Sequence, residues 1–134
     1  MPNRQPGWEL IVKVRILLVD DSPMVRRAMR SLIERNPKLE VCGEAENGQI
    51  AVEMFRQLNP DLVVLDFSMP VKNGLQAAQE ISNLHPGIPL LMVTMFRSEQ
   101  LKKEAEKAGI GTVLSKGDNL SGNLVSTIES LASK

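Results

Sequence analysis

Short, uninterrupted apolar runs recur along this chain, and amphipathic segments separate them. Runs of β-branched and aliphatic residues of this length are typical of strands buried on both faces. The runs are Ile16–Val19, Leu62–Leu65, Pro89–Val93 and, more weakly, Gly111–Leu114. The segment Leu39–Glu44 alternates instead, with Leu39 and Val41 on the apolar side. This alternation places Glu44 on the opposite, polar side and predicts a strand nearer a sheet edge.

Helical patterns follow each of these strands. In Pro23–Arg35, apolar pairs that begin with Met24 and Val25 recur every four residues and predict a buried stripe. Ser22 is a suitable N-cap, and Pro23 suits the first helical position, where its missing N–H costs nothing. The opposite face, predicted to be solvated, carries Arg26, Arg27 and Arg30. Four more helices are predicted from apolar spacing: Ile50, Ala51, Met54, Phe55 and Leu58; Leu75, Ala78, Ile81 and Leu84; Leu101, Ala105 and Ala108; Leu120, Leu124, Ile128 and Leu131.

Five successive pairs of strand and helix predict an α/β fold. The strands should form a parallel sheet that is covered by helices on both faces and joined by right-handed crossovers. A length of 134 residues fits one domain. Residues 1–13, which include two prolines and a glycine, are predicted to form an N-terminal tail, and residues 14–134 the domain.

Composition excludes several classes of function. The 16 basic and 16 acidic side chains cancel, so the basic surplus that favours direct nucleic-acid binding is missing. No apolar run approaches the roughly 20 residues that span a bilayer, and the N-terminus lacks a signal-peptide pattern. The single cysteine, Cys42, fits a reducing compartment. We therefore expect a cytoplasmic protein without membrane contact.

Polar residues stand directly after the predicted buried strands. They are Asp20 and Asp21 after the first, Asp66 after the third, Thr94 after the fourth, and Ser115 and Lys116 after the fifth. In an open α/β sheet, ligands bind beyond the carboxyl ends of the strands. These side chains are therefore expected to gather in one site.

Charge indicates what such a site can do. Three neighbouring carboxylates repel one another, and a hard divalent cation such as Mg²⁺ relieves that repulsion. A carboxylate beside the metal can act as a nucleophile and accept a phosphoryl group. The oxygens of that group would then be neutralised by the metal and by Lys116, and Thr94 could donate a hydrogen bond.

The segments LVDDSPMVRRAM, LVVLDFSMPVKNG, VTM and VLSKGD resemble the receiver domain of two-component response regulators, over residues 14–132. The resemblance implies a flavodoxin-like, doubly wound, five-stranded parallel sheet with strand order 2-1-3-4-5. It implies that Asp66 is the phospho-acceptor and that Thr94 and Lys116 are the switch hydroxyl and the family's lysine. The metal site is implied to consist of Asp20, Asp21, Asp66 and the backbone carbonyl of Ser68, with Asp21 binding directly and Asp20 largely through water.

The resemblance also implies partners. A histidine kinase or phosphotransfer protein would phosphorylate Asp66 in a Mg²⁺-dependent reaction, and the face of the fourth helix, fifth strand and fifth helix would signal the change. Slow self-dephosphorylation, rather than turnover of an external substrate, makes the chain a signalling domain and not an enzyme. The segment NPKLEVCGEAENGQIA is most similar to receivers followed by a helix-turn-helix DNA-binding output domain, which this chain does not contain. A phosphorylation-dependent homodimer is a further expectation.

Two positions depart from the family pattern. Val113 stands where receivers usually carry a Tyr or Phe that moves inward with the switch hydroxyl, so switching should be weaker or different. Met95 stands where a small residue is usual and should narrow the approach to Asp66, which predicts slower phosphorylation or hydrolysis. The alternative function is a phosphate-independent interaction module. A haloacid-dehalogenase-type phosphatase is disfavoured because Ser68 occupies the position of its second aspartate.

Overall fold

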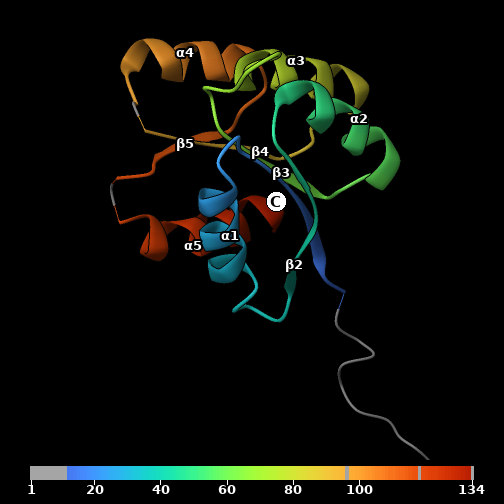
Figure 1. Cartoon of the computed structure of the whole chain (residues 1–134), viewed down its shortest axis with the longest axis vertical. Helices are drawn as coiled ribbons and strands as arrows, with labels where there is room; N and C mark the ends of the chain where they lie inside the picture. The colour runs from blue at the N-terminus through green and yellow to red at the C-terminus, as the bar shows by residue number, and fades with distance from the viewer. Residues whose placement is uncertain (1–11, 96, 118, 134) are drawn as a thin grey trace, which may run out of the picture.

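The computed structural model describes residues 12–95, 97–117 and 119–133 (Figure 1). The five strands are β1 (Val14–Val19), β2 (Leu39–Ala45), β3 (Leu62–Leu65), β4 (Leu90–Thr94) and β5 (Thr112–Ser115). The five helices are α1 (Pro23–Ile33), α2 (Gly48–Leu58), α3 (Gly74–Leu84), α4 (Glu99–Lys107) and α5 (Leu120–Ala132). Most of the predicted N-terminal tail, residues 1–11, lies outside the described residues.

All five strands run parallel in the order β2-β1-β3-β4-β5, which confirms the predicted flavodoxin-like fold. Strand β1 lies inside the sheet. The chain adds β2 on one side of β1 and then β3, β4 and β5 on the other side. The winding direction therefore reverses between β1 and β3. In doubly wound sheets, this reversal opens a crevice at the carboxyl ends of the two strands.

Helices cover both faces of the sheet (Figure 1). The face that packs against α2, α3 and α4 contains Leu17 and Val63, with Ile81 of α3 packed in the same core, whereas the face toward α1 and α5 contains Ile16 and Val64. Every residue of β3 is fully buried, which explains why its sequence is an unbroken apolar run. Burial of each such side chain contributes about 1.5–3 kcal/mol before entropy is counted.

The start of α1 agrees with its predicted cap, but the apolar stripe is narrower than predicted. The Ser22 hydroxyl accepts a hydrogen bond from the Val25 backbone N–H at 3.2 Å, and Pro23 opens the helix. The pattern predicts Met24 in the core, whereas the structure leaves it 75% exposed. Met24 lies in the first turn, beyond the carboxyl end of β1, where the sheet no longer offers a surface to cover.

The predicted alternation of β2 is wrong after Val41, because the strand contains a bulge. Ile16 pairs with Val41 and Leu17 pairs with Gly43, so Cys42 is left over between them. An extra residue reverses which side chains face which side. Glu44 therefore lies on the same face as Val41, toward α1, and not on the opposite face.

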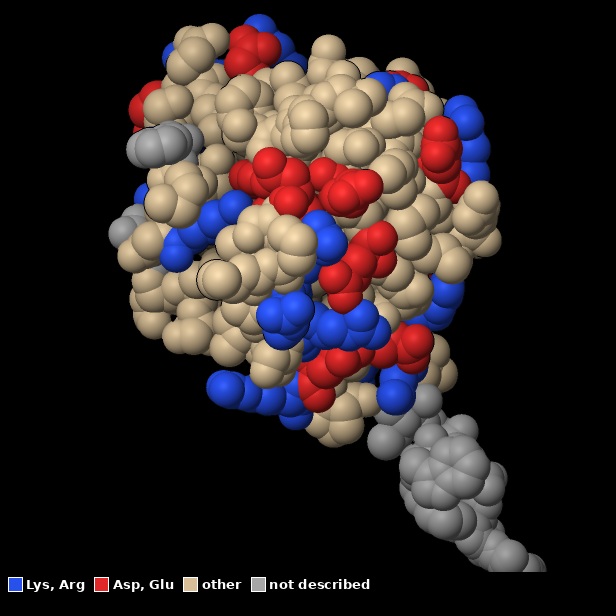
Figure 2. All heavy atoms as spheres, in the orientation of Figure 1, with Lys and Arg blue, Asp and Glu red and all other residues tan. Residues whose placement is uncertain are grey.

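The charged surface is mixed. Figure 2 shows basic and acidic side chains interspersed on one face of the molecule, in agreement with the balanced composition. In the described part of the chain, no helix is both long enough and apolar enough to cross a membrane.

Candidate functional site

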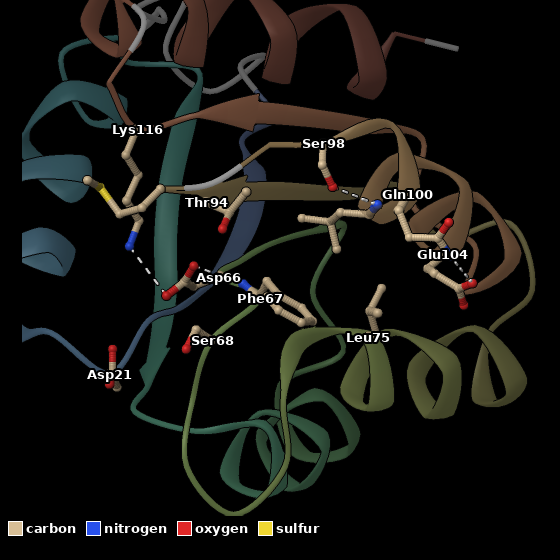
Figure 3. Close-up of a pocket in the computed structure, with 12 residues that line it drawn as sticks. Asp21, Asp66, Phe67, Ser68, Leu75, Thr94, Ser98, Gln100, Glu104 and Lys116 are labelled. Atoms are coloured by element: carbon tan, nitrogen blue, oxygen red, sulfur yellow. Dashed lines mark hydrogen bonds and ion pairs between the residues drawn. The ribbon is translucent and has the colours of Figure 1, made fainter.

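The predicted site residues come together at the carboxyl edge of the sheet (Figure 3). Backbone hydrogen bonds between neighbouring strands continue past the ends of the strands and set the positions of these residues. Asp20 donates to the Ala45 carbonyl at 3.1 Å, Asp66 to the Val19 carbonyl at 3.0 Å, and Lys116 to the Thr94 carbonyl at 2.8 Å. Thr94 itself is the last residue of β4. The parallel sheet thus brings the carboxyl ends of β1, β3, β4 and β5 to one place.

The three aspartates form a compact acidic cluster. Asp20 is fully buried, Asp66 is 6% exposed and Asp21 is exposed. One carboxylate oxygen from each lies within 4.8 Å of the others. Asp20 Oδ2 is buried and receives no hydrogen bond of ordinary geometry from the described residues. Oxygen donors that converge in this way fit a hard divalent cation.

Lys116 balances much of the negative charge. Its Nζ lies 2.7 Å from Asp20 Oδ2 and 3.3 Å from Asp66 Oδ2, and Figure 3 shows it directed at the Asp66 carboxylate. The pKa of the Lys116 ammonium is raised: burial lowers it, but the contact with Asp20 and the negative charge of both carboxylates outweigh burial. Lys116 therefore stays positively charged at neutral pH.

The environment of Asp66 disfavours the charged form of its carboxyl, whereas that of Lys116 favours its charged form. Burial raises the pKa of its carboxyl above the ordinary value, Lys116 opposes this effect, and the charge of Asp20 adds to it. The Phe67 backbone N–H donates to Asp66 Oδ1 at 2.8 Å, whereas Oδ2 faces Lys116. A buried carboxylate with few hydrogen bonds keeps its nucleophilic electron pairs available.

Asp66 opens into a cavity of about 650 Å³. Asp21, Ser68, Thr94 and Lys116 line the polar end of this cavity. The other end reaches between α3 and α4, where the apolar Phe67, Leu75 and Leu101 line it. The polar Ser98, Gln100 and Glu104 also line this end. Met95 also lines the cavity but is 58% exposed, so it borders the entrance without closing it.

The loop after β3 is shaped by two backbone features. A Cβ atom on Gly74 would lie 2.1 Å from the Asp66 carbonyl oxygen, so the start of α3 can approach Asp66 only as glycine. Val71 has a φ of +69°, and the Lys72 N–H donates to the Pro70 carbonyl at 2.7 Å. This is a γ-turn with a strained, β-branched central residue. The PVKNG segment contains no glycine at position 71 that would have indicated it.

Arg26 makes buried contacts that the sequence pattern did not indicate. Its side chain is 16% exposed rather than solvated, and its Nη1 donates to the Asp20 carbonyl at 2.5 Å. The amphipathic pattern of α1 separates apolar from polar positions but does not show which polar residues have buried partners. Val113 is buried beside α4, as expected for its position in β5.

Comparison with known proteins identifies the family. The family described as response regulator receiver domain matches residues 16–128. The chain is 39% identical over 102 residues to the chemotaxis protein CheY of Halobacterium salinarum, which covers 76% of this chain and 83% of that protein. It is 42% identical over 87 residues to a protein-glutamate methylesterase/protein-glutamine glutaminase of Pyrococcus abyssi. That match covers 65% of this chain but only 23% of the relative.

A solved structure extends the likeness to three dimensions. The two-component response regulator of the LuxR family from Aurantimonas sp. SI85-9A1 superposes with a TM-score of 0.86 at 33% identity. The superposition covers 90% of this chain and 86% of that structure. Sequence, strand order and three-dimensional likeness agree, and the chain belongs to the response regulator receiver domains.

Proposed function

We propose that this chain is a signalling switch in which Asp66 accepts a phosphoryl group in a Mg²⁺-dependent reaction. The observation that carries the proposal is the joint contact of Lys116 with Asp20 and Asp66, inside a cluster that also contains Asp21. A buried nucleophilic carboxylate, a fixed cation and a convergent set of oxygen donors are the parts that phosphoryl transfer requires.

Each side chain has a defined task in this reaction. An oxygen of Asp66 attacks the phosphorus of the donor, a new O–P bond forms, and the bond from phosphorus to the leaving group breaks with its electron pair. Lys116 releases its contact with Asp66 Oδ2 and neutralises one phosphoryl oxygen. The Thr94 hydroxyl donates a hydrogen bond to another. Both side chains line the cavity into which Asp66 opens.

The metal site is proposed to consist of Asp21, Asp66 and the Ser68 carbonyl, with Asp20 acting largely through water. When bound, Mg²⁺ supplies positive charge that offsets the charge gathered on the phosphoryl oxygens. The protein residues keep the carboxylates close enough to share the ion, and they exclude bulk water from Asp20.

The proposed partners follow from this chemistry. A histidine kinase or a phosphotransfer protein donates the phosphoryl group, and the face formed by α4, β5 and α5 signals to a partner or to a DNA-binding output domain, with a phosphorylation-dependent homodimer as one form of output. The likeness to a LuxR-family response regulator supports the output domain. The chain would not turn over an external substrate. Residues 14–134 would form this domain behind a tail of residues 1–13, in the cytoplasm.

Intact-mass measurement after incubation with acetyl phosphate and Mg²⁺ tests the proposal. We expect a gain of one phosphoryl group, and no gain with a chelator or in Asp66→Asn. Asp61→Asn is the matched control, because Asp61 precedes the same strand but, among the described residues, its side chain accepts a hydrogen bond only from the Arg15 backbone N–H, at 2.8 Å. If wild-type protein bound Mg²⁺ but gained no mass from acetyl phosphate or a kinase, the phosphate-independent interaction module would replace this proposal.

A further inference from the structure

The backbone of Asp20 is held on both sides of its Cα atom, and the peptide unit between Asp20 and Asp21 is held through its carbonyl. The Asp20 N–H donates to the Ala45 carbonyl on β2, and the Asp20 carbonyl accepts the Arg26 guanidinium at 2.5 Å. Ser22 adds a third restraint, because its backbone N–H donates to Asp20 Oδ1 at 2.9 Å. The contact with Arg26 is charge-assisted, and the Arg26 side chain is only 16% exposed, so water competes little for it.

Asp21 depends on this peptide for its orientation. Within the described residues, no hydrogen bond or ion pair reaches the Asp21 carboxylate, and the side chain is exposed. Because a peptide unit is planar, the direction of the Asp20 carbonyl determines the direction in which the Asp21 backbone leaves it. Arg26 therefore helps to set the direction from which the Asp21 carboxylate starts, and that carboxylate makes no hydrogen bond or ion pair of its own within the described residues.

Arg26 is itself immobilised by a small network on α1 and β2. Its Nε donates to Glu44 Oε1 at 3.0 Å, and Arg30 Nη1 donates to the other oxygen of Glu44 at 2.5 Å. The bulge at Cys42 turns Glu44 toward α1 and makes this network possible. Figure 2 shows basic and acidic groups side by side on one face, consistent with mutual neutralisation.

We propose that Arg26, held by Glu44, is a positioning residue that orients Asp21 for the divalent cation. The inference rests on the proposed Mg²⁺-dependent function and adds to it a residue that touches neither the ion nor the phosphoryl group. Residues that orient metal ligands typically change metal affinity by 10–100-fold when they are replaced. We expect Arg26→Gln to weaken Mg²⁺ binding by roughly tenfold, at the lower end of that range.

Whether replacing Arg26 weakens or strengthens Mg²⁺ binding distinguishes a positioning role from a purely electrostatic one. A guanidinium near a cation site repels the cation, so removing its charge alone should strengthen Mg²⁺ binding. Loss of orientation should weaken it. Arg30→Gln is the matched control, since it removes the same charge from the same Glu44 without a contact to Asp20. Arg15→Gln is the stability control, because Arg15 Nη1 also donates to a backbone carbonyl, that of Leu58 at 2.8 Å, away from the site.

The experiment is a calorimetric Mg²⁺ titration of the full chain and the three variants, with urea unfolding of each without metal. Support requires roughly tenfold weaker binding in Arg26→Gln, with Arg30→Gln and Arg15→Gln within about twofold of wild type. If Arg26→Gln does not fold, Arg26→Lys replaces it in the experiment. Lysine keeps the charge but cannot bridge Glu44 and the Asp20 carbonyl with one planar group. This variant should therefore also bind Mg²⁺ more weakly than wild type.

A kinetic measurement gives an independent readout. With acetyl phosphate as donor, Arg26→Gln should raise the Mg²⁺ concentration for half-maximal phosphorylation while the rate at saturating Mg²⁺ stays near that of wild type. Equal or tighter Mg²⁺ binding by Arg26→Gln, with wild type binding normally, overturns the positioning role and leaves the proposed function intact. Wild-type protein that binds no Mg²⁺ overturns both.

Discussion

The two loops that carry the acidic cluster are bound far more firmly than the helix on the other side of the cavity. The loop before α1 is tied to β2 through Asp20 and Arg26, and α3 begins with a capping box between Asn73 and Gln76. By contrast, α4 borders the 650 Å³ cavity, which its Gln100, Leu101 and Glu104 line.

The start of α5 is also held less firmly than the starts of the other helices. Its N-cap residue, Asn119, is in the left-handed region and makes no side-chain cap hydrogen bond, whereas the four other helices are capped by a serine or asparagine side chain. The contrast fits the proposed function, in which the aspartates need fixed geometry for phosphoryl transfer and the α4 and α5 side needs freedom to change shape.

Core truncations on α3 and α4 measure this contrast most directly. Ile81→Ala on α3 should lower the free energy of unfolding by about 4 kcal/mol, because the side chain is fully buried. Leu101→Ala should cost only about 2 kcal/mol, since the cavity already deprives Leu101 of contacts on one side. Urea unfolding followed by circular dichroism gives both values. Equal losses would mean that α4 is packed as firmly as α3.

Two glycines sharpen the comparison at the helix starts. Gly74→Ala should cost about 3 kcal/mol, since the new Cβ would lie 2.1 Å from the Asp66 carbonyl oxygen and the backbone must shift. In Gly122→Ala the new Cβ would meet the exposed Asn119 side chain at 2.7 Å, which can rotate away. The helix preference for alanine then leaves stability within about 0.5 kcal/mol of wild type. A large loss in Gly122→Ala would contradict the loose start of α5.

Phosphorylation should act on the loosely held side. With acetyl phosphate and Mg²⁺, amide hydrogen exchange in α4, β5 and α5 should change by roughly tenfold, or about 1.4 kcal/mol of local opening, while α1 and β2 stay the same. Mass spectrometry of peptic fragments reports each element, and Asp66→Asn controls for the additives. Changes confined to α1 and β2 would reverse the division proposed here.

The sequence predicted most of the fold because apolar runs report burial directly. Strands and helices appear where the patterns place them, with ends shifted by a residue or two, although the strand order came from the family resemblance. The gathering of Asp20, Asp66 and Lys116 was also predictable, because parallel strands carry their carboxyl ends to one edge.

The bulge in β2 and the role of Arg26 were not predictable in this way. Alternation in Leu39–Glu44 assumes one residue per ladder position, and a single extra residue at Cys42 inverts the side on which Glu44 lies. Without that inversion, the arginines of α1 have no visible partner and resemble an ordinary solvated face. The exposure of Met24 has a similar cause, since helical spacing does not show where the sheet beneath it ends.

The γ-turn in the tightly held half should carry a measurable cost. Val71→Gly should raise the free energy of unfolding by about 1 kcal/mol, because glycine adopts a φ of +69° without the penalty of a β-branched residue. Val71 is 80% exposed, so little burial is lost. Val12→Gly is the matched control, being exposed and outside any helix or strand. No gain over that control would mean that the turn is not strained.

Met95 offers the smallest effect on stability and a separate effect on rate. Because it is 58% exposed, Met95→Ala should change the free energy of unfolding by less than about 0.5 kcal/mol. Because it lines the cavity, we nevertheless expect Met95 to narrow the path by which a donor or water reaches Asp66. The variant should therefore be phosphorylated by acetyl phosphate, or dephosphorylated after its removal, several-fold faster than wild type. If both rates were unchanged in a folded variant, Met95 would lie outside the approach path, and the cavity entrance would have to be sought elsewhere along its rim.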